Sequence, residues 1–338
     1  MTPMGNGIPK QGDSSSSYTA STSKKDLLSL ADCSPRELVH LLRLASRLKT
    51  QARAGRRLRP LVGKTIGLIF EKPSTRTRVS FEAGMNQLGG QALFLPSEKI
   101  QLSRGESLAD TAQVLSRYLD ALVIRTYEQQ IVEEWARNAT IPVINGLTDL
   151  CHPCQALADL LTIMEKKGRL KGVKLAYVGD GNNMANSLIE AGAKVGMHVV
   201  IACPSGYEPN AEFLERSRKD AARTGATIQI TDDPFVAAKE ADVVYTDVWI
   251  SMGQEKERAR RLNALAPYQV NRHLLEHASP AAIVMHCLPA HRGEEITGEV
   301  LDGPQSVVLD QAENRLHMQK AILVHFLCPS KRSSFKMK

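Results

Sequence analysis

The stretch "KTIGLIFEKPSTRTRVSFE", residues 64–82, holds two patterns from which the fold can be predicted. Its first part, 64–70, is a short apolar run, which predicts a buried β-strand. Pro73 and Ser74 then suit the start of a helix, with Ser74 as the N-cap residue. The helix should present one apolar face and stop at Gly89-Gly90, after Phe81, Met85 and Leu88. A buried strand followed directly by a helix is typical of an α/β protein.

The same alternation extends outward from this stretch. Helix starts are predicted at Ser34-Pro35 and at Ser107-Leu108, and further strands at 120–126 and 141–145. From about residue 155 the alternation restarts, with strands predicted at 173–179, 198–203, 227–230, 242–247, 282–287 and 306–310. Strands that alternate with helices form parallel sheets covered on both faces. We therefore predict an α/β fold of two doubly wound domains, each with a mainly parallel sheet flanked by helices.

Five segments follow from this pattern. The Ser-rich segment at the N-terminus should be a disordered tail, and the short C-terminal segment a loose basic tail. Between them we expect two domains and a terminal helix that returns to pack on the first domain. The predicted segments are 1–24, 25–155, 156–310, 311–328 and 329–338.

Composition narrows the possible partners. The formal net charge of +7 permits either nucleic acid or a small anionic substrate, but aromatic residues are only 5% of the 338, which is poor material for stacking bases. No apolar run approaches the ~20 residues of a membrane helix, and the N-terminus has no apolar signal segment. We expect a cytoplasmic protein without a membrane or nucleic-acid partner. An organelle matrix is the alternative if residues 1–24 act as a transit peptide.

The six cysteines are expected to be reduced, buried thiols rather than a disulfide framework. Cys151-His152-Pro153-Cys154 is a CxxC motif, so zinc binding and redox chemistry are alternatives. A structural zinc site needs a second ligand pair at similar spacing, and the sequence offers none. His286 and His291 are a further metal alternative without an obvious third ligand. We expect no metal and no organic cofactor.

Ligands of doubly wound sheets bind at the carboxyl ends of the strands, so the residues after each strand are the candidates for a binding site. After the strand at 64–70, a helix N-terminus offers free N–H groups beside the hydroxyls of Ser74, Thr75 and Thr77. Arg76 adds a charged fork for phosphate oxygens. A capped, solvated helix start needs one hydroxyl only, so phosphate binding is favoured. Arg78 is two residues further on and should point away from Arg76, so we expect it to serve in packing or in an ion pair.

Two more strand ends of the first domain carry donors. Arg125 ends an apolar strand and is either paired with an acid or directed at an anion. Asn145-Gly146 follows the next strand. His152 and Gln155 come next, as two donors near a helix start, with structural and binding roles both open.

Three strand ends of the second domain stand out. "GDGNN" (179–183) resembles a dinucleotide-binding loop, but Met184 replaces the third glycine and the next strand ends without an acid, so Asn183 is better suited to a small polar substrate. Asp247 can bind an ammonium group or cap a helix. Cys287 ends the strand at 282–287, as a buried thiol or a site residue.

Together these motifs resemble the aspartate/ornithine carbamoyltransferase superfamily. The resemblance covers about residues 25–327, and STRTR and HPCQ carry it for the superfamily as a whole. SMG and HCLP resemble the branch of the family that acts on ornithine. The matching motifs are STRTR (74–78), HPCQ (152–155), GDGNN (179–183), DxxxSMG (247–253), HCLP (286–289) and AENR (312–315).

The resemblance implies transfer of a carbamoyl group from carbamoyl phosphate to the side-chain amine of L-ornithine, as part of arginine metabolism. It also implies a homotrimer, or a multiple of trimers, with active sites between neighbouring subunits. The implied catalytic residues are Arg125, His152, Asp247 and Cys287. The implied contacts of carbamoyl phosphate are Ser74, Thr75, Arg76, Thr77, Gln101 (from a neighbouring subunit), Arg125, His152, Gln155, Cys287, Leu288 and Arg315. Those of ornithine are Asn183, Asp247, Ser251 and Met252.

Two alternatives stay open at this point. The first is carbamoylation of a related amine such as putrescine. The second is a non-enzymatic regulator that binds nucleic acid on a basic surface, for which basic residues should cluster on one face. The arginines of the motifs are instead spread one per strand end, as a convergent pocket requires.

Overall fold

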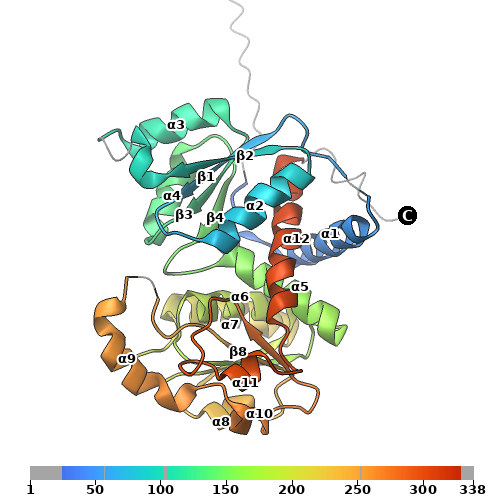
Figure 1. Ribbon diagram of the computed structural model, residues 1–338, viewed down its shortest axis with the longest axis vertical. Coiled ribbons are helices and arrows are strands. Elements are labelled where there is room, and N and C mark those ends of the chain that lie inside the picture. Colours follow the sequence, from blue (N-terminus) through green and yellow to red (C-terminus); the bar gives the residue numbers. More distant parts are fainter. Residues whose placement is uncertain (1–24, 57, 102–104, 252, 329–338) are drawn as a thin grey trace, which may run out of the picture.

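The computed structural model describes residues 25–56, 58–101, 105–251 and 253–328. They form two halves that lie one above the other along the longest axis of the molecule (Figure 1). Each half contains one parallel sheet flanked by helices, so the predicted α/β fold is confirmed. The tails expected at 1–24 and 329–338 lie outside the described residues.

The first half contains a four-stranded sheet of order β2-β1-β3-β4. Its strands are β1 (Thr65–Phe70), β2 (Gln91–Pro96), β3 (Ala121–Arg125) and β4 (Val143–Leu147). Its helices are α1 (Pro35–Arg53), α2 (Thr75–Gln87), α3 (Leu108–Tyr118) and α4 (Gln129–Asn138), with short 3₁₀ turns at Leu30–Asp32 and Ser97–Lys99. The predicted N-caps are confirmed, because the hydroxyls of Ser34, Ser74 and Ser107 each accept the N–H three residues on.

The second half contains a five-stranded sheet of order β7-β6-β5-β8-β9. Its strands are β5 (Lys174–Val178), β6 (His198–Ala202), β7 (Ile228–Thr231), β8 (Val243–Thr246) and β9 (Ile283–His286). Its helices are α6 (Asn183–Val195), α7 (Ala211–Thr224), α8 (Pro234–Ala238), α9 (Arg258–Leu265), α10 (Arg272–Leu275) and α11 (Gly298–Leu301), with 3₁₀ turns at Glu255–Glu257 and Ala266–Tyr268.

Two helices join the halves. The buried helix α5 (Pro153–Lys167) lies between the two sheets and packs against α6 on one side and α1 on the other. The last helix, α12 (Val308–Leu327), follows the second half but packs against α1, α2 and α5 of the first (Figure 1). The two ends of the described chain therefore meet in the first half.

Three strand predictions need correction. The apolar run at 306–310 is not a strand: Ser306 forms a single bridge with Val284, and Val308 already begins α12, with Leu309 turned to solvent. The edge strand β2 was not predicted, although its sequence contains the short apolar run 92–95; in the structure its residues are exposed or half-buried. The fourth strand is shifted to Val143–Leu147, so Asn145 and Gly146 lie within it rather than after it.

The topology identifies where a ligand should bind. In the first sheet the strand order reverses between β1 and β3, and in the second it reverses between β5 and β8. Open α/β sheets bind ligands at the carboxyl ends of the strands beside such a reversal. These four strand ends carry Ser74, Arg125, Asn183 and Asp247, respectively.

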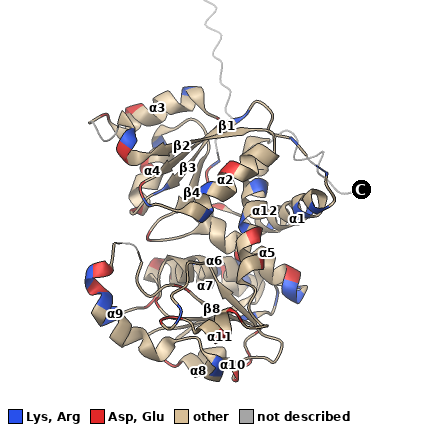
Figure 2. Ribbon diagram, in the orientation of Figure 1, with Lys and Arg blue, Asp and Glu red and all other residues tan. Residues whose placement is uncertain are grey.

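Charged residues of both signs alternate over the helices of both halves, without a face that is basic throughout in this view (Figure 2). None of the helices in the described part of the chain combines the length and apolar character needed to cross a membrane.

Candidate active site

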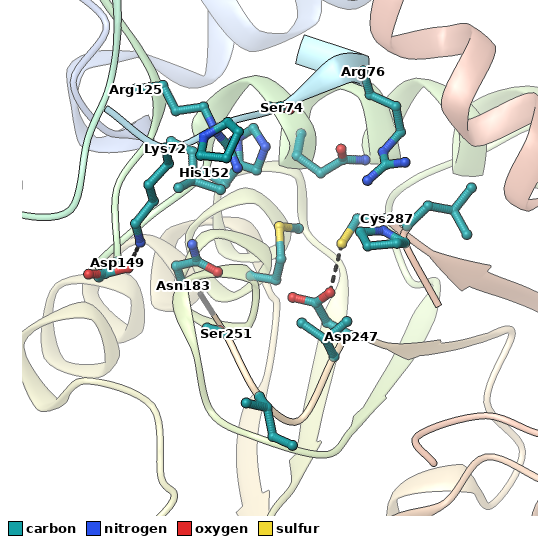
Figure 3. A pocket seen from close by; sticks show the side chains of 18 of the residues that line it. Lys72, Ser74, Arg76, Arg125, Asp149, His152, Asn183, Asp247, Ser251 and Cys287 are labelled. Atoms are coloured by element: carbon teal, nitrogen blue, oxygen red, sulfur yellow. Dashed lines mark hydrogen bonds and ion pairs between the residues drawn. The ribbon is translucent and has the colours of Figure 1, made fainter. Parts of the chain in front are cut away.

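A cavity of about 520 Å³ lies between the two halves, at the carboxyl ends of both sheets. Figure 3 shows Arg125, Ser74 and Arg76 along one side of it, with Asp247 and Ser251 opposite. Twelve of the residues predicted from the sequence line this cavity: Ser74, Thr75, Arg76, Arg125, His152, Gln155, Asn183, Asp247, Ser251, Cys287, Leu288 and Arg315.

One wall of the cavity is formed by cations without counter-charges. Arg125 is only 6% exposed and its Nε has no hydrogen-bond partner. Arg315 is 4% exposed; within the described part of the chain its one side-chain hydrogen bond is from Nη2 to Thr77 Oγ1, at 2.6 Å. Neither guanidinium forms an ion pair within the described residues. Burial, and then the charges of Arg315 and Arg76, lower the pKa of Arg125 to about 9, so it is still charged at neutral pH. Of the two alternatives for Arg125, direction toward an anion is the one that fits.

The N-terminus of α2 completes this wall. Ser74 caps the helix by accepting the N–H of Thr77 at 3.2 Å, and its hydroxyl lies 3.0 Å from Thr77 Oγ1. Thr77 is fully buried below the cavity, where it accepts from Arg315, and is not among the lining residues. Arg76 is directed into the cavity (Figure 3). Helix N-terminal N–H groups beside cations form a site for a phosphate.

Arg78 is turned away from this wall, and both expectations for it are confirmed. Its Nε donates to Glu82 at 2.9 Å, and its guanidinium lies 3.7 Å from the ring centroid of Phe94 on β2. It therefore joins α2 to the edge of the sheet.

His152 and Gln155 lie at the start of α5, below the cation wall. His152 is 4% exposed and its Nδ1 has no partner. Burial, and then Arg315 and Arg125, lower the pKa of His152 well below its ordinary value, so the ring is neutral. Gln155 was expected to act as a donor, but its NH₂ group donates to Asp159 at 2.8 Å and leaves Oε1 without a partner.

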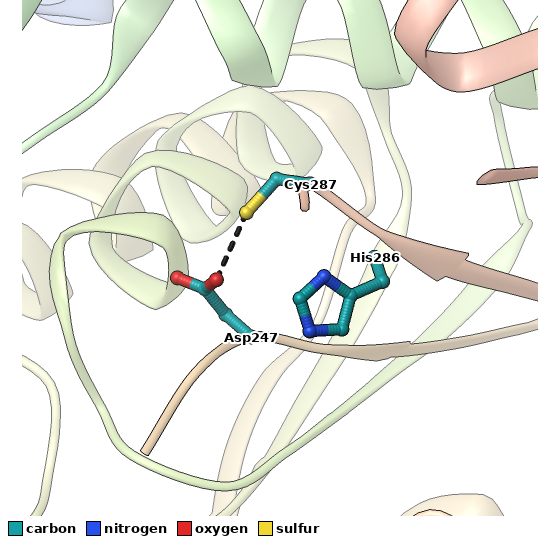
Figure 4. Close-up of side chains that lie close together, drawn as sticks. All are labelled: Asp247, His286 and Cys287. Carbon is teal, nitrogen blue, oxygen red and sulfur yellow. Dashed lines mark hydrogen bonds between the residues drawn. The ribbon is translucent and has the colours of Figure 1, made fainter. Parts of the chain in front are cut away.

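The opposite wall is formed by the ends of β8 and β9. The Cys287 thiol donates to Asp247 Oδ1 at 2.9 Å (Figure 4), and Asn182 Nδ2 donates to Asp247 Oδ2 at 2.9 Å. Burial, and then Asp247, raise the pKa of Cys287 well above its ordinary value, so the thiol keeps its proton. The alternative of Asp247 as a helix cap is wrong, because its carboxylate accepts from these two side chains and no helix begins beside it.

The metal alternative at His286 gains no support from the geometry. Asp247, His286 and Cys287 could place ligand atoms within 4.8 Å of one another. However, His286 Nδ1 accepts the N–H of Leu288 at 2.9 Å, and Nε2 lies 3.1 Å from the carboxylate of Glu295. Both ring nitrogens are therefore engaged in holding the turn after β9.

The CxxC motif is similarly occupied. Cys151 and Cys154 are buried free thiols that donate to the carbonyls of Leu28 and Asn145, each at 3.4 Å. Burial raises the pKa of each to about 12, which disfavours the thiolate that redox chemistry or zinc binding requires.

The remaining predicted residues differ in placement. Asn183 Nδ2 donates to the carbonyl of Thr148 at 2.7 Å, which joins the two halves beside the cavity. Leu288 has a φ of 60°, a strained backbone conformation for a bulky residue. Gln101 is exposed and does not line the cavity. Met252 lies outside the described residues.

Several lining residues were missed from the sequence. Lys72 is 2% exposed, forms an ion pair with Asp149 and lies 4.2 Å from the ring centroid of Tyr127. Its place directly after β1 could have identified it, since the strand-end rule applies equally there. Glu255, in a 3₁₀ turn, and Arg258, at the start of α9, also line the cavity. His291 lines it as well, although the sequence suggested it only as a metal ligand.

Comparison with known proteins agrees with this geometry. Residues 25–165 match the family model described as aspartate/ornithine carbamoyltransferase, carbamoyl-P binding domain, and residues 171–326 match the Asp/Orn binding domain of the same family. The chain is 59% identical over 303 residues to the ornithine carbamoyltransferase of Anoxybacillus flavithermus, which covers 90% of this chain and 96% of that one.

Solved structures give the same result. The ornithine carbamoyltransferase of Pyrococcus furiosus superposes with a TM-score of 0.87 at 55% identity, over 89% of this chain and 96% of that one. The anabolic enzyme of Campylobacter jejuni gives a TM-score of 0.85 at 40% identity, over 89% and 98%.

The chain therefore belongs to the aspartate/ornithine carbamoyltransferase family, and the resemblance read from its motifs is confirmed. Within that family it groups with the ornithine carbamoyltransferases, since the similar proteins above all carry that name.

Proposed function

We propose that the protein transfers the carbamoyl group of carbamoyl phosphate to the side-chain amine of L-ornithine, which yields L-citrulline and phosphate in arginine biosynthesis. The observation that carries this proposal is the pair of opposed walls: unpaired cations at the α2 N-terminus face the Asp247–Cys287 pair across one cavity. A doubly charged phosphate and a cationic amine each have a complementary wall. Ornithine is favoured over putrescine because the names of the similar proteins specify it.

In this proposal the phosphate binds at the first wall. Its oxygens accept from the N-terminus of α2 and from the nearby hydroxyls, and the guanidinium groups neutralise its charge. The residues that contact the phosphate are Ser74, Thr75, Arg76 and Arg125, while Thr77, buried below the cavity, contributes by holding Arg315 in place.

The carbamoyl group then lies beside Arg125, His152 and Arg315. Attack at its carbonyl carbon creates negative charge on the oxygen, and donors already in position stabilise that charge without reorganising. The neutral His152 is suited to donate one hydrogen bond here, while Arg125 and Arg315 supply charge. Gln155 addresses the same group from below.

Ornithine binds from the second half in this mechanism, through Asn183, Asp247, Ser251 and Met252. Its side-chain amine must be neutral to attack, yet with a pKa near ~10.4 only about one part in 10³ is neutral at pH 7. Asp247 and Cys287 orient the amine near Leu288. The new N–C bond forms first, giving the oxyanion; the C=O bond then re-forms as the C–O bond to phosphate breaks, and the leaving phosphate takes the proton that the amine loses.

The role of the thiol can be tested separately. Cys287→Ser should lower kcat by about tenfold and shift its pH profile, because a hydroxyl then replaces the thiol that donates to Asp247 near the reacting amine. An unchanged turnover and an unchanged pH profile would remove the thiol from the mechanism.

A homotrimer, or a multiple of trimers, is part of the proposal. Gln101 is exposed and lies outside the cavity of its own chain, which leaves it free to contribute to another subunit's site as the family resemblance implies. Light scattering of the purified protein tests the trimer, and Gln101→Ala should raise KM for carbamoyl phosphate. A cytoplasmic location also stays a prediction, which cell fractionation can check.

The reaction itself is tested by incubating the protein with carbamoyl phosphate and, separately, L-ornithine, putrescine, aspartate or N-acetylornithine. We expect citrulline from ornithine and no carbamoylated product from the other three. A chain that makes no product from any amine would not be an enzyme of this kind.

A further inference from the structure

Asp159 is a buried acid that the mechanism above does not use. It lies one helical turn after Gln155 on α5 and is 0% exposed. Three neutral groups surround its carboxylate: Gln155 Nε2 and Gln311 Nε2 each lie 2.8 Å from Oδ1, and the Tyr245 hydroxyl lies 3.0 Å from Oδ2. It forms no ion pair within the described part of the chain.

This arrangement determines which end of the Gln155 amide faces the carboxylate. Burial raises the pKa of Asp159 to about 7, but the three donors that contact its oxygens fit the ionised form. An ionised carboxylate can only accept, so the amide turns its NH₂ group toward Asp159 and its oxygen away. With the ionised form, the reverse orientation would place two oxygens within 2.8 Å without a proton between them. The Gln311 amide is fixed in the same sense. Its oxygen accepts the N–H of His286 at 2.9 Å, so its NH₂ group must also face Asp159.

The consequence appears in the cavity. Gln155 is 1% exposed, lines the cavity, and leaves its Oε1 buried without a partner. The neighbouring Arg125 and Arg315 are donors only. Gln155 therefore adds a buried acceptor to a wall of donors. A complementary ligand group carries oxygens that accept from the two arginines and an NH₂ group that donates to the Gln155 oxygen.

We propose that Asp159 is a positioning residue that holds the Gln155 amide with its oxygen toward the cavity and so selects a carbamoyl group over an acyl group without N–H. This inference rests on the proposed function and deepens it. A site that accepts a hydrogen bond from a substrate N–H disfavours an analogue that lacks it, because the buried acceptor is then left unpaired.

The same carboxylate also connects the two walls. Tyr245 lies on β8 two residues before Asp247, and Gln311 binds the backbone of His286 next to Cys287. Asp159 thus holds the residue that addresses the carbamoyl group in register with the strand ends that carry Asp247 and Cys287.

The test compares carbamoyl phosphate with acetyl phosphate, in which a methyl group replaces the NH₂. The quantity measured is the ratio of their affinities, from inhibition by acetyl phosphate and from thermal shifts with each compound alone. Asp159→Ala should reduce this ratio by about tenfold, the contribution of one hydrogen bond, because the Gln155 amide becomes free to rotate.

Two variants serve as controls. Tyr245→Phe removes a hydrogen bond from the same carboxylate but leaves the Gln155 contact, so it should keep the ratio. Asp159→Asn should also keep most of it, since the side-chain oxygen can still accept from Gln155 while its NH₂ faces the Tyr245 hydroxyl. If Asp159→Ala does not fold, Asp159→Leu fills the space and provides the same comparison.

An unchanged ratio in folded Asp159→Ala or Asp159→Leu, or an equal loss in Tyr245→Phe, would overturn the inference. Citrulline formation by the unaltered protein tests the reaction independently. Failure of the reaction and failure of the positioning role are therefore distinguishable.

Discussion

The helix starts after β1 and β5 share one geometry and differ in charge. Each follows a central strand beside the reversal of strand order, and each helix is capped by a polar side chain, Ser74 on α2 and Asn182 on α6. Asn182 caps more fully, because its oxygen accepts the N–H groups of Met184 and Ala185. Backbone geometry alone would make both of them anion sites.

The charged side chains near the two helix N-termini change this: they favour an anion at α2 but not at α6. Arg76, Arg125 and Arg315 surround the first, whereas Asp180 and Asp247 lie beside the second. Asp180 is paired with Arg261 at 2.9 Å, so Asp247 is the acid that is directed at the cavity. Burial lowers the pKa of the base Arg125 to about 9 and raises that of the acid Asp180 to about 6. The lesson is that a helix N-terminus offers donors, while the neighbouring charges decide whether a phosphate or an ammonium group binds there.

The largest expected effect comes from removing a cation at the first start. Arg125→Gln should lower kcat/KM by about 10³, since it removes charge from both the phosphate and the developing oxyanion. Its melting temperature should stay the same or rise, because an unpaired buried cation is removed. Steady-state kinetics and thermal melts measure both quantities.

Arg78→Gln is the matched control for that variant. Its guanidinium packs on Phe94 outside the cavity, so kinetics should be unchanged while the melting temperature falls slightly. Less than a tenfold kinetic loss in Arg125→Gln would contradict the cation wall.

Asp180, beside the N-terminus of α6, should make the free energy of unfolding depend on pH. The pKa of Asp180 is about 6 in the folded state against an ordinary value of 3.8, chiefly because of burial, so the folded state binds its proton more tightly. The stabilisation is complete below pH ~3.8 and is lost as the pH rises through about 6, by roughly 3 kcal/mol at most.

Asp180→Asn should abolish this component. Urea unfolding at pH 4 and pH 6.5 would then give a smaller fall in the free energy of unfolding for the variant than for the unaltered protein. Equal falls in both proteins would show that Asp180 does not titrate in this range.

Inorganic phosphate should stabilise the folded protein by binding at the N-terminus of α2, and not at the N-terminus of α6. At 100 times its dissociation constant it should stabilise the folded state by about 2.7 kcal/mol, and the melting temperature should rise accordingly. Asn182→Ala should keep this protection and Arg125→Gln should lose it. Protection that persists in Arg125→Gln would place the phosphate elsewhere.

The caps themselves provide the smallest and most direct comparison. Ser74→Ala and Asn182→Ala should each cost about 1 kcal/mol of stability. Ser74→Ala should raise KM for carbamoyl phosphate, whereas Asn182→Ala should raise KM for ornithine, since Asn182 also donates to Asp247. A rise in the same KM for both variants would mean that the two starts do not bind different substrates.

Local sequence was sufficient to predict those features that depend on residues close together in the chain. The caps at Ser34, Ser74 and Ser107 and most of the buried strands are of this kind, because hydroxyl spacing and apolar runs act within one element. The run at 306–310 misled for the same reason: its apolar residues suit a strand, but packing across the two halves makes Val308 the first residue of a long helix.

The sequence by itself determined the order of strands and helices, the polar residues at the strand ends and the family to which they point. Only the tertiary structure decided that Arg125 and Arg315 lack counter-charges, that Arg78 faces Phe94, and that Asp159 orients Gln155. The physical reason is that a charge or an amide acquires its role from the groups around it in space. Those groups come from strands and helices more than a hundred residues apart, such as α5 and α12.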